Sequence, residues 1–177
     1  MTSIDLDLFV LALVQSGLAT TYDLKSKAGL SVGSTAPILA RLEEAGLIQA
    51  AKPGVREVRR FSVTKEGRKH LTVGWKELLE RRPTDVDEVL RITYIAWAMD
   101  SPEVASKFVE SAAAGLQYLA ATRNAEANQL QSTLGEHVGG QAFRWLRTAA
   151  DAARLHAQAE ALKQLGRQIK TKKSKRR

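Results

Sequence analysis

One hairpin pattern inside an otherwise helical chain limits the fold of these 177 residues most strongly. Residues 47–52 and 59–63 are short runs rich in apolar and β-branched residues on either side of Pro53-Gly54, as expected for two antiparallel strands. Thr64 follows at once and can cap a helix that continues to residue 80. The sequence therefore predicts strand, turn, strand and helix in close succession.

Three short helices are predicted before the hairpin. Their ranges are 7–15, 22–28 and 32–45. Thr21 and Ser31 are the expected N-caps of the second and third helices, and a glycine follows each helix as a stop signal. Three helices, two strands and a fourth helix, in this order, are typical of a winged helix-turn-helix domain. We assign it to residues 1–80.

The remainder of the chain has a helical pattern without a convincing strand. A break at residues 81–85 separates it from the first region, and Asp100-Ser101-Pro102 ends its first helix. Longer helices are expected over 103–130 and 141–168. Leu155, Leu162 and Ile169 recur every seven residues and require a facing helix. The prediction is a mainly α protein whose residues 85–168 form an all-helical dimerisation domain.

Charge and composition exclude several protein classes. The chain contains no cysteine, so disulfide frameworks and thiolate metal sites are excluded. The longest strongly apolar stretch, residues 8–14, is too short to span a bilayer, and acidic residues near the start do not fit a signal peptide. Seven of the 27 basic residues lie within residues 167–177. We expect a protein without a membrane partner, ending in a flexible basic tail at 169–177.

The predicted third helix has two contrasting faces. Its apolar face carries Thr35, Ile38, Leu39 and Leu42. The opposite face is unusually small and is formed by Gly33, Ala36, Pro37, Ala40 and Glu44, with Ser34 and Arg41 at its edge. A small face lets a helix backbone lie deep in a major groove, where alanine methyls touch thymine methyls and Ser34 or Arg41 reaches bases or phosphates. The alternative is a solvent-exposed helix that happens to hold small residues.

Basic residues lie on the two predicted elements beside this helix. They are Lys25 and Lys27 on the second helix and Lys52, Arg56, Arg59 and Arg60 on the hairpin, where they can contact phosphates. The candidate DNA-binding residues are therefore Lys25, Ser31, Ser34, Ala36, Pro37, Ala40, Arg41, Arg56, Arg59 and Arg60.

The first region resembles the PadR-like winged-helix transcriptional regulators. The resemblance rests on residues 22–25, on 33–48 with its Arg41-Leu42-Glu43-Glu44-Ala45-Gly46-Leu47-Ile48 run, and on 59–67 with its Thr64-Lys65-Glu66-Gly67 start of the fourth helix. The chain departs from that family in having Thr35-Ala36 where members commonly carry leucine and tyrosine, so a tyrosine contact to DNA is not carried over to Ala36. Its wing tip, Pro53-Gly54-Val55-Arg56, also differs from the usual Gly-Arg-Pro. The second region is similar to that of longer members in layout.

The resemblance implies a sequence-specific regulator, more often a repressor, in the bacterial cytoplasm on the nucleoid. Its partners would be double-stranded DNA at a palindromic operator and a second copy of the chain, with a small-molecule effector left open. The alternative is a winged-helix protein-interaction module whose basic tail alone makes non-specific nucleic-acid contact. A regulator encoded by a virus or mobile element would share the same chemistry.

The spacing of the reactive residues does not indicate a catalytic, metal or cofactor site. His70, His137 and His156 form no metal-binding pair, and no glycine-rich phosphate loop follows a strand. We therefore expect neither an enzyme nor a bound cofactor. The aromatic residues of the second region could line an effector cavity or pack in a core, and we expect that they pack in a core. They are Tyr94, Trp97, Phe108, Tyr118, Phe143 and Trp145.

Overall fold

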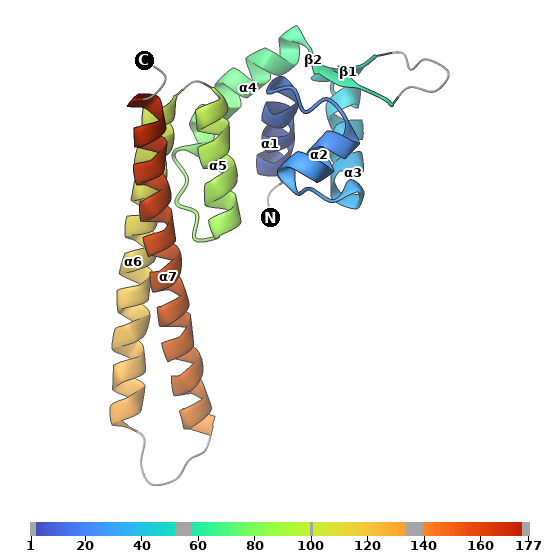
Figure 1. Cartoon of the computed structure of the whole chain (residues 1–177). Coiled ribbons are helices and arrows are strands. Elements are labelled where there is room, and N and C mark those ends of the chain that lie inside the picture. Colours follow the sequence, from blue (N-terminus) through green and yellow to red (C-terminus); the bar gives the residue numbers. More distant parts are fainter. Residues whose placement is uncertain (1–2, 52–57, 100, 134–139, 175–177) are drawn as a thin grey trace. The chain divides into compact units, whose positions relative to one another are not determined.

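A computed structural model describes residues 3–51, 58–99, 101–133 and 140–174 (Figure 1). The chain divides into two compact units, each of which is described by itself. The first comprises residues 1–81 and 91–101, and the second comprises 82–90 and 102–177. No helix in the described ranges is both long and apolar enough to cross a membrane.

The first unit has the predicted winged helix-turn-helix order. Its elements are α1 (Ser3–Gln15), α2 (Thr21–Ala28), α3 (Val32–Glu44), β1 (Ile48–Ala50), β2 (Phe61–Val63) and α4 (Lys65–Leu78). Ser31 and Thr64 cap α3 and α4, as predicted, by accepting backbone N–H bonds of Ser34 and Gly67. The predicted cap of α2 was wrong by one residue. Thr20 caps α2, because its hydroxyl both accepts the Asp23 N–H and donates to the Asp23 carboxylate.

The core of this unit forms around α1, which packs against α3 and α4. Leu8 and Leu11 of α1 are buried together with apolar residues of the surrounding helices: Leu24, Ile38, Leu39, Leu42, Leu71 and Leu78. Part of α5 (Val86–Ala98) also belongs to this unit, since the rings of Phe9 and Tyr94 meet edge to face with centroids 5.5 Å apart.

The two strands form an antiparallel hairpin in which Ile48 pairs with Val63 and Ala50 with Phe61. Ile48 and Phe61 point into the core, so the alternate side chains of each strand face outward. The backbone N–H of Phe61 also donates to the Ala19 carbonyl at 2.7 Å. This bond joins the hairpin to the turn that precedes α2, which places the hairpin beside the helices of the predicted DNA-binding face.

The second unit is dominated by a pair of long antiparallel helices, α6 (Pro102–Ser132) and α7 (Gly140–Ser174), which lie side by side (Figure 1). Small residues on α6 allow close approach: the Ser106 hydroxyl donates to the Gly166 carbonyl at 3.1 Å. Leu162 and Ile169 are buried in the same unit. The helix that faces the heptad-like α7 residues is therefore α6 of the same chain.

The last helix continues beyond its predicted end at residue 168. Ile169 is buried, and the Lys170 ammonium pairs with Glu110 of α6 at 2.7 Å. This pairing, with smaller contributions from the Ser106 hydroxyl and then Arg167, holds the pKa of Glu110 below its ordinary value despite an opposing effect of burial. Residues 169–174, which we expected in a flexible tail, are accordingly helical because α6 supplies packing and a charge partner for the start of this segment.

Candidate nucleic-acid interface

The exposed face of α3 contains only small side chains over most of its length. Thr35, Ile38, Leu39 and Leu42 are buried, as the helical periodicity predicted. The exposed positions on the opposite face are Gly33, Ala36, Pro37 and Ala40, followed by Glu44 in the last turn. A Cβ built on Gly33 would meet no atom within 4 Å, so the surroundings of this face are open. Because its side chains are small, this face can bring the backbone of α3 close to another macromolecule.

The hydroxyls of Ser31 and Ser34, two candidate DNA ligands, are engaged in capping α3. The Ser31 hydroxyl oxygen accepts the Ser34 N–H at 3.1 Å and lies 2.8 Å from the Ser34 hydroxyl oxygen, which also donates to the Ser31 carbonyl at 2.9 Å. Both residues are nonetheless exposed at the N-terminus of α3. The positive end of the helix dipole lies here, which favours an anion such as phosphate.

Arg41 lies at one edge of the small face and is paired with a residue far away in the sequence. Its guanidinium donates to the carboxylate of Asp7 on α1 through Nη2, 2.6 Å from Oδ1, and through Nε, 3.3 Å from Oδ2. The bond to Asp7 raises the pKa of Arg41 above its ordinary value. The pair joins the N-terminal helix to the edge of α3.

Arg59 is held at the other edge of α3 by Glu43. Its Nη2 atom lies 2.7 Å from Oε1 and 2.6 Å from Oε2 of Glu43. The guanidinium also lies over the Phe61 ring, 5.3 Å from its centroid, in a cation–π contact. Because Phe61 is buried in the hairpin, the position of Arg59 is defined by both α3 and β2. No local pattern in the sequence indicated the Asp7 or Glu43 partner.

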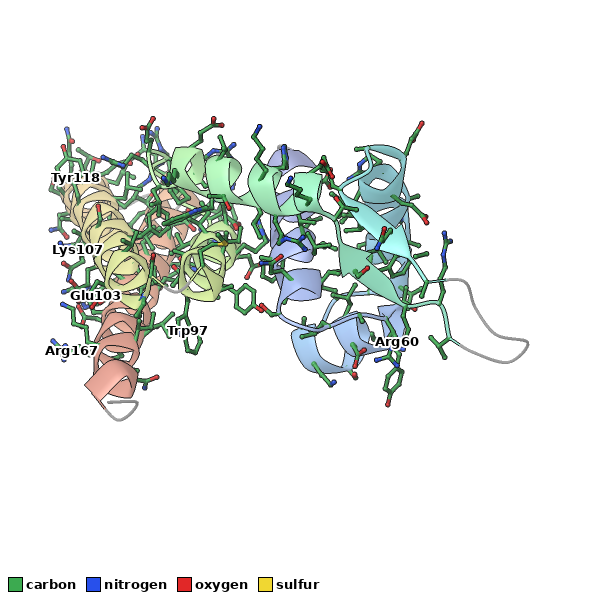
Figure 2. All side chains as sticks on the ribbon, turned by 90° about the horizontal axis from the view of Figure 1, so that it is seen from above. Arg60, Trp97, Glu103, Lys107, Tyr118 and Arg167 are labelled. Atoms are coloured by element: carbon green, nitrogen blue, oxygen red, sulfur yellow. The ribbon has the colours of Figure 1, made fainter. Side chains whose placement is uncertain are left out.

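The remaining candidate cations are exposed around these pairs. Arg60 lies at the start of β2 on the outside of the unit (Figure 2), and Lys25 is exposed on α2. Lys27 pairs with Asp23 at 2.7 Å, and this bond together with the Thr20 hydroxyl lowers the pKa of Asp23. Lys52 and the candidate Arg56 lie outside the described residues.

The second unit offers a shallow cleft and several exposed aromatic rings. The cleft has a volume of about 410 Å³ and lies between α6 and α7, with Gln117, Asn124 and His156 among alanines. The expectation that the aromatic residues form a core holds for Phe108, which is buried, but was wrong for Trp97 of α5, which is 38% exposed. It was also wrong for Tyr118 and Phe143, which are 73% and 69% exposed. These two positions fall on helix faces that the α6–α7 pair does not cover. Within the described ranges, no group of three or more His, Cys, Asp or Glu side chains could hold a metal ion.

Comparison with known proteins finds similarity among solved structures. No protein-family model matches the chain, and no curated protein matches it. Among solved structures, it is similar to Bacillus subtilis PadR in complex with operator DNA, with 17% sequence identity over 92% of this chain and 97% of that chain and a TM-score of 0.41.

Proposed function

We propose that this chain is a PadR-like, sequence-specific DNA-binding transcriptional regulator that acts as a repressor in the bacterial cytoplasm. The observation that carries the proposal is the exposed face of α3, on which Gly33, Ala36, Pro37 and Ala40 are bordered by Arg41 and Arg59. Small apolar side chains at the centre and cations at the edges match a major groove, which has base edges at its floor and phosphates at its rims.

In the proposed complex, α3 lies in the major groove and the neighbouring elements contact the backbone. The methyl groups of Ala36 and Ala40 pack on thymine methyls, while Ser34 and Arg41 reach base edges or nearby phosphates. The exposed Lys25 and Arg60 neutralise phosphates on either side of the groove. Residues 1–80 would thus read DNA, and residues 85–168 would join two copies.

Dimerisation is proposed to occur through α6 and α7, with a second copy of this chain as the partner. The supporting observation is that Tyr118, Phe143 and Leu146 remain exposed on these helices although Leu162 and Ile169 are covered. A two-fold dimer would place two α3 helices roughly 34–36 Å apart, one turn of DNA, over a palindromic operator, where it would block polymerase.

Sedimentation equilibrium tests the dimer directly. We expect a mass of about 39 kDa, twice the 19.4 kDa of one chain, at micromolar concentration. The double variant Tyr118→Ser/Phe143→Ser, which removes two exposed rings, is expected to weaken association without unfolding the helices. A mass near that of one chain at every concentration would overturn this part of the proposal.

Selection of binding sites from randomised DNA duplexes tests the function itself. We expect the purified chain to enrich one palindromic sequence and to bind it at least about 10³-fold more tightly than random duplex. Affinity for both should fall steeply between about 50 and 200 mM salt because cations on the protein replace counterions. Enrichment of no sequence, together with salt-dependent binding that is lost when residues 171–177 are removed, would favour a protein-interaction module with a non-specific basic end.

A further inference from the structure

The two edges of the small α3 face each carry an arginine neutralised by a carboxylate. Arg41 and Glu43 are two residues apart on α3 and therefore diverge by about 200° around the helix axis. Arg41 binds Asp7 on the side of α1, and Glu43 binds Arg59 on the side of the hairpin. The proposed DNA-binding face is thus bordered by two ion pairs instead of two unpaired cations.

These pairs are exposed enough to exchange partners with DNA. The side chains of Arg41 and Arg59 are 48% and 56% exposed, and exposed ion pairs are weak because water and salt screen them. A phosphate can therefore displace a carboxylate from either arginine. The displaced carboxylate then lies close to the phosphate backbone, where like charges repel, so each exchange gains less than an unpaired arginine would gain.

We propose that Asp7 and Glu43 are specificity-determining residues of the DNA-binding face, which lower its affinity for DNA of any sequence and hold Arg41 and Arg59 in place. This inference rests on the proposed function. Non-specific binding depends almost wholly on charge, whereas binding to the operator also includes contacts between the small face of α3 and base edges. At the operator, base contacts hold α3 against the groove, so Arg41 and Arg59 exchange their carboxylates for phosphates there. On other sequences nothing holds the helix in that position and the arginines stay with their carboxylates, so non-specific binding is weakened by the larger factor.

Glu43→Gln tests the proposal, with Glu77→Gln as its charge-matched control. Glu77 is exposed on α4, outside α3 and the hairpin. Both substitutions remove one negative charge, but only Glu43→Gln releases an arginine. For a random duplex at about 0.1 M salt, we expect Glu43→Gln to raise affinity roughly fivefold and to steepen the salt slope by about 0.9, the value for one added phosphate contact.

The operator obtained by selection with the unaltered protein provides the second measurement. Glu43→Gln is expected to raise operator affinity by less than twofold, so the ratio of specific to non-specific affinity falls about threefold or more. In an Arg59→Gln background, Glu43→Gln should raise affinity for a random duplex by less than about twofold, because no arginine remains to be released. Asp7→Asn is expected to lower the ratio in the same way through Arg41.

Equal increases in operator and random-duplex affinity would overturn the proposal, as would identical effects of Glu43→Gln and Glu77→Gln. Thermal unfolding of each variant, followed by circular dichroism, shows whether the fold is retained. If the unaltered protein selects no operator, the proposed function has failed and this inference fails with it. If the unaltered protein is specific and only the variants miss the expected ratios, the inference alone is wrong.

Discussion

Replacing Gly67 by alanine is expected to lower the free energy of unfolding of the first unit by about 3 kcal/mol, because the new methyl group has no space. A Cβ at this position would overlap the backbone carbonyl oxygen of Leu47 and crowd a methyl carbon of Val63. That carbonyl cannot easily withdraw, since it accepts the Thr64 N–H at 3.0 Å. The Gly67 N–H itself donates to the Thr64 hydroxyl that caps α4. Relief of the overlap would therefore detach α4 from the hairpin.

Urea unfolding followed by far-ultraviolet circular dichroism measures this effect, and a thermal midpoint lowered by roughly 10 °C should accompany it. Gly74→Ala in the same helix is the matched control. Its Cβ would meet only the end of the flexible Leu8 side chain, at 3.0 and 3.1 Å, and alanine favours a helix more than glycine does. We expect Gly74→Ala to change stability by less than about 1 kcal/mol. Equal midpoints for Gly67→Ala and the unaltered protein would contradict the packing described here.

Features specified by neighbouring residues could be predicted from the sequence. Ser31 and Thr64 stand three residues before the N–H groups that they cap, and the third and fourth helices begin as expected. The predicted N-cap of α2 was wrong because either of two adjacent threonines can act as an N-cap. The choice of Thr20 depends on a second bond, from its hydroxyl to the Asp23 carboxylate at 2.7 Å. The buried face of α3 followed from helical periodicity alone.

Features specified by distant residues could not be predicted in the same way. A seven-residue repeat in α7 requires a facing helix but contains nothing that tells whether that helix belongs to the same chain. Arg41 was known to lie at an edge of α3, yet its partner is 34 residues away on another helix, and the partner of Arg59 is 16 residues away. These pairings depend on how the elements pack. They mean that Arg41 and Arg59 are bound to carboxylates in the free protein.

Replacing Ala40 by glutamate is expected to abolish operator recognition while leaving the fold intact. Ala40 is exposed on the small face of α3, so a longer side chain fits in the free protein at little cost to stability. In the proposed complex, the same side chain would hold the helix backbone away from the groove floor and would place a negative charge among phosphates. The base contacts would then be lost, and affinity for the operator should fall about 10³-fold or more, towards the level of random duplex.

Fluorescence anisotropy with the selected operator and with a random duplex measures both affinities for Ala40→Glu. Thr72→Glu is the control, because Thr72 is exposed on α4, outside α3 and the hairpin, and the substitution adds the same charge. We expect Thr72→Glu to retain operator binding within about threefold, as a single distant charge is screened. A comparable loss in the two variants would mean that net charge, and not contact at the α3 face, governs binding. Full operator affinity in Ala40→Glu would show that this face does not enter the groove, because the operator was selected with alanine at this position and a glutamate there would hold α3 away from its bases.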